Sequence, residues 1–532
     1  MRNLQTVRGW GKLAFILLFS TSASAYGAAP ISTQKLEQAS TISPEENKDF
    51  ESLLGKHVYS VLSKQSRAEM LNSVRFNVRT NEVIVDLSAS YLPERVNYVT
   101  ATLERSLHEI STDVIFFVER NFDLYISGVT FTFDGRDLSY YYPEDYPAEI
   151  PGSGLRRDVG ITGTTGGQIV LSAGHGLYLK HSTPPAWEFQ RPLSLGVQED
   201  QITQTLVYEL ANLVHQRGLR TIQFVRSYST STHAPSGAPW IDVAARYNLA
   251  QALPGRKDIW NSLPGSTGQD REQDEDIRSR PLYANAIDAA GIISIHTNAF
   301  TTPIPRGTRV YYQPGRSADR ELARSILCYM GEIIQAQDGY EEFPIAPDAH
   351  SGDLGENRLA IGRSAVIVEA AFHTNPDDAA ALQDPVFRTA AMKGVEKGAR
   401  LFELGEPCTP YNITDIPDIS GPWGSTLTFE ISYEGFPQYP VILEVILLSC
   451  TGICEPGGGI IPSEIPSPIQ VGLACNGEQD DPPVEAEWRV SLIDEDGVKG
   501  SYDFTSVCGV SGGATTSTHS HGTPTISVMP LR

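Results

Sequence analysis

The chain has 532 residues, which is too long for one hydrophobic core and predicts about three domains. Its formal net charge is −23, from 41 Lys and Arg against 64 Asp and Glu, and this excess of acid argues against nucleic acid or an anionic membrane surface as a partner. After the amino-terminal segment, no run approaches the roughly 20 apolar residues of a membrane helix, so no membrane span is expected.

Residues 1–25 have the pattern of a secretory signal peptide. A positive start with Arg2, Arg8 and Lys12 precedes an apolar run over 13–19, and the small residues 23–25 form a cleavage site. We therefore expect an exported protein, periplasmic or extracellular. Six cysteines in an exported chain favour disulfide bonds.

Residues 26–50 are polar and rich in Ser, Ala and Gln, which predicts a linker. Residues 51–150 have the pattern of a small α+β domain of unknown role. Its expected elements are a strand over 82–87, a helix over 95–110, and strands over 113–119 and 128–133. No cluster of candidate catalytic residues falls in this domain, so we expect it to serve positioning or binding.

Strands and helices alternate over 166–405, which predicts an α/β domain with a central, mostly parallel sheet and helices on both faces. Three apolar runs of strand length in this domain end abruptly in a residue that can do chemistry, namely His175, His296 and Glu369. Because the carboxyl ends of parallel strands meet at one edge of a sheet, we expect these three side chains to converge.

Glu199 opens the helix that follows the His175 loop. A first-turn acid often only complements the helix dipole, and this interpretation stays open. Two histidines and a carboxylate also form a familiar catalytic zinc site, because three protein ligands leave the fourth position to water. Glu369 would then be free to take that water's proton. The long spacing between these residues matches none of the short zinc motifs.

Two stretches of the central domain resemble the zinc-dependent N-acetylmuramoyl-L-alanine amidases of the Amidase_3 family. The first is the sequence SIHTNA over 294–299, followed by RGTRVYY over 306–312, and the second is AVIVEAAFHTNP over 365–376. The resemblance covers residues 168 to about 404. It implies a peptidoglycan substrate, cut at the amide between N-acetylmuramic acid and the L-alanine of the stem peptide, and leaves open a protein activator as a partner.

Carried over residue by residue, the resemblance implies that His175, Glu199 and His296 bind one Zn²⁺ per chain and that Glu369 is the catalytic glutamate. The sequence departs from the family at Ser172, Leu177 and Ala371, where Asp, Gly and Gly are usual. These departures remove no ligand, but the first two concern the surroundings of His175. Two other functions stay open: a non-catalytic wall-binding protein on a decayed amidase scaffold, and a zinc peptidase acting on other amides.

A polar, acidic segment over 253–280 interrupts the family pattern and is expected to be a loop, either overhanging the substrate groove or lying on the surface. Residues 409–508 alternate in short runs separated by Gly, Pro, Asn and Asp, which predicts an immunoglobulin-like β-sandwich. Cys475 and Cys508 are the expected bridge there. Cys328 and Cys408 form another bridge or leave Cys328 as a free buried thiol. Residues 509–532 are expected to be a disordered tail.

Overall fold

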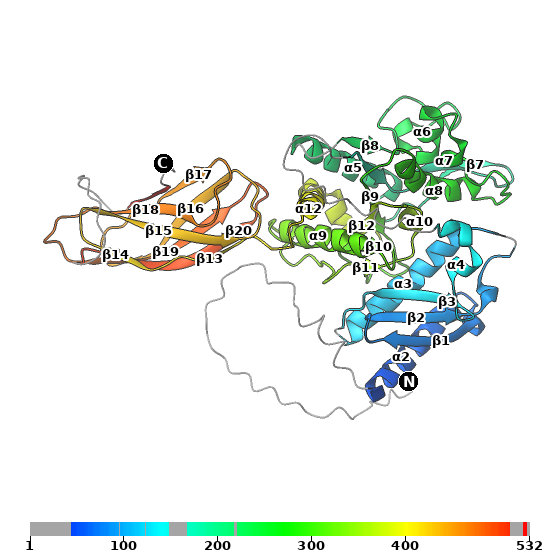
Figure 1. Cartoon of the computed structure of the whole chain (residues 1–532), viewed down its shortest axis with the longest axis horizontal. Helices are drawn as coiled ribbons and strands as arrows, with labels where there is room; N and C mark the ends of the chain where they lie inside the picture. Colours follow the sequence, from blue (N-terminus) through cyan, green and yellow to red (C-terminus); the bar gives the residue numbers. More distant parts are fainter. Residues whose placement is uncertain are drawn as a thin grey trace.

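The computed structural model describes residues 44–94, 96–122, 124–147, 167–217, 221–510 and 525–528. Figure 1 shows an N-terminal α+β unit in blue and cyan, a central α/β domain in green, and a C-terminal β-sandwich in orange and red. The predicted signal peptide lies outside the described residues. Among the helices that are described, none is both long and apolar enough to cross a membrane.

The N-terminal unit starts earlier than its sequence suggests. Helix α2 (Pro44–Lys64) begins inside the segment expected to be a linker, because Phe50, Leu54 and Val58 lie at helical spacing and are buried against the sheet of this unit. The sheet consists of β1 (Leu71–Asn77), β2 (Glu82–Leu87), β3 (Gly128–Phe133) and the short β4 (Arg136–Asp137). The short helices of the unit are η2 (Ala68–Met70), η3 (Ala89–Tyr91), α4 (Leu138–Tyr141) and η4 (Pro143–Asp145).

Helix α3 (Ala101–Phe122) links β2 to β3, which pair in parallel. The strand predicted over 113–119 is therefore wrong. Its β-branched and aromatic residues suggested a strand, but Val114 and Val118 continue the helical stripe that Leu107 belongs to, and all three are buried in the core of the unit. Packing of that stripe outweighs the local propensity for strand.

The central domain is a mostly parallel sheet with helices on both faces, as predicted. Its strands are β5 (Ile169–Ala173), β8 (Ile222–Phe224), β9 (Gly291–Asn298), β10 (Arg309–Tyr312), β11 (His350–Ser351) and β12 (Ser364–Phe372). One face packs in the main hydrophobic core against α5 (Glu199–Gln216), α9 (Ser317–Ile334) and α12 (Pro385–Leu404). The other face meets α8 (Arg271–Ala286) and the short α10 (Gly355–Arg358). The remaining elements are the hairpin β6 (Leu177–Lys180) and β7 (Ala186–Phe189), η5 (Trp240–Asp242), α6 (Ala245–Ala252), α7 (Lys257–Trp260) and α11 (Pro376–Gln383).

The sheet of the N-terminal unit continues the sheet of the central domain. The strand order is β1-β2-β3-β11-β10-β12-β9-β5-β8, and β3 pairs in parallel with β11 through Gly128 and Ser351. A Cβ at position 128 would overlap Ser351, so this junction requires glycine. The first two parts of the chain therefore share one sheet.

The acidic segment over 253–280 is not the predicted loop, because it contains α7 and the first turns of α8. Three of its carboxylates are buried partners of arginines: Arg246 pairs with Glu272 at 2.6 Å and with Glu275 at 2.8 Å. Arg280 pairs with Asp276 at 2.9 Å. These partners are brought together only by tertiary packing, which is why the polar composition suggested a surface loop.

The C-terminal part is a β-sandwich, as expected. One sheet has the order β13 (Asn412–Asp415), β15 (Ser425–Glu434), β18 (Ile469–Cys475) and β21 (Thr525–Val528), and the other β14 (Ile419–Gly421), β20 (Lys499–Cys508), β19 (Val484–Ile493), β16 (Val441–Cys450) and β17 (Gly458–Ile461). Phe429 and Phe504 meet between the sheets, with ring centroids 4.9 Å apart. The predicted disordered tail is wrong at β21, because backbone pairing with β18 places residues 525–528 in the first sheet.

All six cysteines are in disulfides: Cys328–Cys408, Cys450–Cys454 and Cys475–Cys508. The expected Cys475–Cys508 bridge is confirmed, and Cys328 is not a free thiol.

Replacing Cys475 and Cys508 by serine is expected to lower the melting temperature of the sandwich. The bridge closes a sequence separation of 33 residues, for which loop entropy predicts a loss of about 3–4 kcal/mol. Calorimetry of the purified protein measures the change. The double variant at Cys450 and Cys454, four residues apart, is the control and should cost less. Equal losses for both variants would contradict the loop-entropy explanation.

Candidate active site

The turn after β5 places His175 at the edge of the sheet. His175 has φ +58°, in the left-handed region that few residues other than glycine adopt, and Gly176 follows with φ +127°. A Cβ at Gly174 would collide with the ring of His296, so glycine is needed there as well. The local sequence thus brings the first histidine against the second.

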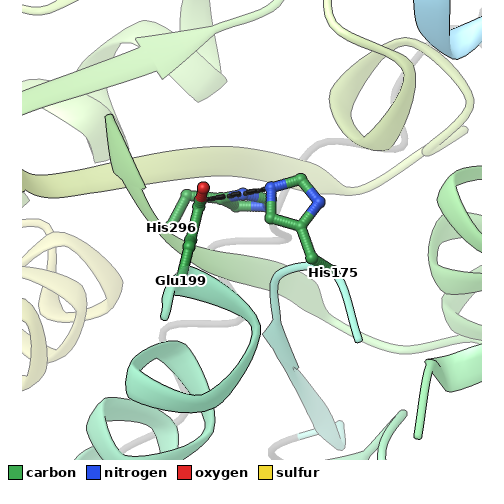
Figure 2. A group of neighbouring side chains, drawn as sticks. All are labelled: His175, Glu199 and His296. Carbon is green, nitrogen blue, oxygen red and sulfur yellow. Dashed lines mark hydrogen bonds and ion pairs between the residues drawn. The ribbon is translucent and has the colours of Figure 1, made fainter. Parts of the chain in front are cut away.

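His175, Glu199 and His296 form one buried cluster, drawn in Figure 2. His175 Nε2 lies 3.1 Å from Glu199 Oε1 and 3.2 Å from His296 Nδ1. His296 Nδ1 lies 3.4 Å from the same carboxylate oxygen. The residues are only 5%, 2% and 7% exposed, and one ligand atom of each lies within 4.8 Å of the others. Two imidazole nitrogens and one carboxylate oxygen facing a common point suit a zinc-like cation.

Each histidine is held by a partner on its other ring nitrogen. Gln190 Oε1 lies 3.2 Å from His175 Nδ1, and Gln190 in turn donates to Asp276 at 2.9 Å. Glu356 Oε1, from α10, lies 3.1 Å from His296 Nε2. Such partners fix the tautomer and ring orientation of a metal-binding histidine. Neither partner was predicted from the sequence, because neither belongs to a motif.

Ser172, one of the departures from the family pattern, belongs to the network around these partners. Its hydroxyl donates to Glu356 Oε2 at 3.2 Å and accepts from Arg280 at 2.9 Å. Arg280 also donates to the backbone carbonyls of Ala173 and His175, so it fixes the turn itself. Burial raises the pKa of Glu356, but Arg280 and His296 outweigh it and hold the pKa well below its usual range.

Replacing Glu356 by glutamine is expected to weaken metal binding by about 10 to 100-fold, the usual effect of removing a partner of a ligand histidine. The glutamine still bonds to His296 but no longer carries the charge that makes the ring a better ligand. Competition with a chelator measures the affinity. The matched control is the exposed Glu341→Gln. Unchanged affinity in Glu356→Gln would show that its contact with His296 has no influence on the metal.

Glu369 lies beside this cluster. It lies within β12, which continues to Phe372, and is the pairing partner of His296 on β9. Glu369 Oε2 is buried and has no hydrogen-bond partner within the described part of the chain. Burial raises the pKa of Glu369 to about 8. A buried carboxylate with a free oxygen and a pKa near neutrality is suited to proton transfer.

The N-terminal unit reaches this site through α3, a contact that was not expected from the sequence. His108 lies near enough to His296 and Glu199 to feel their charges, and its ring packs edge-on against Tyr311 of β10, with ring centroids 5.2 Å apart. Further along α3, Phe116 packs edge-on against Phe372, with ring centroids 5.4 Å apart. Because the segment after residue 112 was expected to be a strand, no continuous face directed at the site could be predicted.

Asp274 of α8 caps α3: its carboxylate accepts from the backbone N–H of Ala101 at 2.7 Å and from the Tyr98 hydroxyl at 3.1 Å. Burial raises the pKa of Asp274 to about 7. Its contribution to stability is therefore full below about pH 4, near its unfolded value, and is lost as the pH rises through about 7.

The Asp274→Asn variant is expected to lack this dependence. As the pH rises from 4.5 to 8, the unfolding free energy of the wild type should fall relative to that of Asp274→Asn. Urea denaturation at the two pH values measures it, with the exposed Asp258→Asn as control. Parallel pH profiles for wild type and Asp274→Asn would contradict the expectation.

An α/β sheet that carries a His–Glu–His cluster and a free carboxylate at its carboxyl edge has the layout of a metal-dependent hydrolase. Residues 169–400 match the sequence model of the Amidase_3 family, described as N-acetylmuramoyl-L-alanine amidase. A comparison with curated proteins gave no match.

Solved structures of amidases are similar to a part of the chain. The CwlD amidase from Clostridioides difficile, solved in complex with the GerS lipoprotein, is 16% identical over 45% of this chain and 98% of its own, with a TM-score of 0.32. The catalytic domain of CwlV from Bacillus (Paenibacillus) polymyxa var. colistinus is 16% identical over 45% of this chain and 98% of its own, with a TM-score of 0.31. The amidase AmiC2 of Nostoc punctiforme is 15% identical over 46% of this chain and 100% of its own, with a TM-score of 0.30.

Proposed function

We propose that this protein is an exported peptidoglycan hydrolase that cleaves the amide bond between N-acetylmuramic acid and the L-alanine of the stem peptide. The observation that carries the proposal is the convergence of His175, Glu199, His296 and Glu369 at one sheet edge, inside the segment that matches the amidase family model. The three disulfides support an oxidising, extracytoplasmic location.

The metal in this proposal is one Zn²⁺ per chain, held by His175, Glu199 and His296. A zinc ion there would polarise the amide carbonyl and acidify the attacking water. Gln190 and Glu356 keep the imidazole nitrogens of His175 and His296 directed at the common point.

Glu369 is the proposed general base and acid. Its unpartnered Oε2 takes the proton of the attacking water as the water adds to the carbonyl carbon. Glu369 then returns that proton to the alanine nitrogen, so the amide breaks into a lactyl carboxylate and a free amine. The buried surroundings of Glu369 disfavour a lasting charge, which helps it hold the proton between the two steps.

The proposal is tested by digesting purified peptidoglycan with the mature protein and measuring zinc in the same sample. Released stem peptides with free L-alanine amino termini, about one zinc per chain, and loss of activity on chelation are expected. Zinc without cleavage of wall or of a soluble muramoyl peptide would contradict the assigned reaction. Cleavage of the soluble peptide alone would indicate that an activator protein opens the wall substrate to the enzyme.

A further inference from the structure

A row of three side chains crosses neighbouring strands of the central sheet at the site. Glu369 on β12 is paired in register with His296 on β9 and, on its other side, with Arg309 on β10. Strand β10 is antiparallel to β12, and directly opposed residues of such strands place their side chains on one face, with Cβ atoms about 4.5–5.5 Å apart. Arg309 is therefore the cross-strand neighbour of the proposed proton carrier.

Glu369 is a natural acceptor for this arginine. Its Oε2 is buried and lacks a hydrogen-bond partner among the described residues. A guanidinium and a carboxylate form one of the strongest hydrogen-bonded pairs in proteins, and the arginine stem is long enough to cross to the next strand. A cavity of about 240 Å³ lies beside Arg309, so the guanidinium is not packed tightly on that side.

The N-terminal unit directs Arg309 elsewhere. Near the end of α3, Glu119 accepts from Arg309 Nη1 at 3.1 Å and from Nη2 at 2.8 Å, which is a bidentate pair. Phe116 of the same helix lies against the guanidinium, with Cζ 4.2 Å from the ring centroid. His350 Nε2 accepts from Nη1 at 2.7 Å, and His350 Nδ1 donates to the carbonyl of Ile126 at 3.2 Å. The guanidinium is thus held against the N-terminal unit.

Arg309 depends on Glu119 for the balance of its charge. The residue is only 4% exposed, so water cannot readily replace a lost carboxylate. Its Nε is also buried and without a partner in the described part of the chain, so the guanidinium has a donor to spare. Without Glu119, the carboxylate across the strand pair is the partner that restores the balance.

We propose that Glu119 is a positioning residue of the active site: it holds Arg309 away from Glu369 and thereby keeps the Glu369 carboxylate open to water and substrate. The inference rests on the proposed function. It gives the N-terminal unit a role in that function, because Glu119 comes from α3 and Arg309 and Glu369 come from the central sheet. The central domain carries an arginine able to block its own catalytic glutamate, and the N-terminal unit removes this block.

Initial rates on a soluble muramoyl peptide test the proposal in the full-length mature protein. Glu119→Gln keeps the shape but removes the charge that holds Arg309. We expect kcat to fall by about 10 to 100-fold, the effect of a charge-assisted hydrogen bond that now occupies Glu369. Adding Arg309→Met should recover most of the loss, because methionine still packs against Phe116 and cannot bind Glu369. Glu119→Asp, shorter by one methylene, should show a smaller loss with the same recovery.

The matched control is Glu209→Gln, which removes a carboxylate of similar exposure from its ion pair with Arg388, between α5 and α12. It should leave kcat unchanged, and zinc content should be equal in all variants. Wild-type kcat in Glu119→Gln would overturn the proposal. A loss that Arg309→Met does not recover would overturn it as well, because that is the result of a purely structural role.

Urea denaturation provides a measurement that does not depend on catalysis. Glu369→Gln should lower the urea midpoint more in the Glu119→Gln background than in the wild type, because only there does it remove the partner of a buried arginine. The additional decrease should vanish when Arg309→Met is also present. Equal decreases in all three backgrounds would overturn the proposal.

The two measurements also separate this inference from the amidase function. If the wild type cleaves no muramoyl peptide but the additional decrease in midpoint is present, the amidase function fails and the role of Glu119 in holding Arg309 stands. If the wild type and Glu119→Gln cleave equally well, the amidase function stands and the role of Glu119 fails.

Discussion

Replacing Glu369 by glutamine is expected to lower kcat by about 10²–10⁴-fold, the usual contribution of a general acid–base residue. The glutamine has nearly the same shape, but it cannot take a proton from water or return it to the alanine nitrogen. None of the three proposed ligand side chains changes, so zinc content should stay at the wild-type level. Initial rates on a soluble muramoyl peptide, with zinc measured on the same preparation, check both statements.

The exposed Glu487→Gln in the sandwich is the control and should leave kcat unchanged. Near-normal turnover in Glu369→Gln would show that Glu369 is not the proton carrier. Loss of zinc in that variant would instead assign Glu369 to metal binding.

Replacing Lys397 by methionine is expected to destabilise the protein by about 3–5 kcal/mol, the cost of leaving one charge of a buried ion pair without its partner. Lys397 Nζ lies 2.6 Å from Glu332 Oε2, and both residues are buried between α12 and α9. Glu332 Oε1 also accepts from the backbone N–H of Tyr411 at 2.7 Å. The pair therefore joins the two helices to the start of the sandwich.

Chemical denaturation measures this loss. The double variant Lys397→Met with Glu332→Gln should recover much of the stability, because glutamine is neutral and still accepts from Tyr411. Arg489→Met removes one partner of an exposed ion pair with Asp503 and should cost no more than about 1 kcal/mol. A similarly small loss in Lys397→Met would show that Glu332 is not left as an unpaired charge.

The convergence of the candidate site residues could be predicted from the sequence because strongly apolar runs lead up to them. His175 follows β5, whereas His296 and Glu369 lie near the carboxyl ends of β9 and β12; all three strands are buried along their length, and the edge of the sheet brings the side chains together. The role of Glu199 was harder to predict, since an acidic residue in the first turn of a helix often only complements the helix dipole. Its position after the His175 loop was the useful signal.

The surroundings of the site could not be predicted in the same way. Gln190 lies in a loop and Glu356 in a helix of four residues, so neither has a periodic pattern to mark it. Helix α3 was divided into helix and strand because β-branched and aromatic residues follow its first half. The contact of the N-terminal unit with the site was therefore absent from the expected architecture.

The measurement that tests the central claim most directly is hydrolysis of a soluble muramoyl peptide in ¹⁸O-labelled water, followed by mass spectrometry of both products. We expect one ¹⁸O in the lactyl carboxylate of N-acetylmuramic acid and an unlabelled peptide with a free L-alanine amino terminus. Label in a carboxylate of the peptide would assign a peptidase reaction at another amide. No products from a zinc-loaded wild-type enzyme would contradict the proposed hydrolysis altogether.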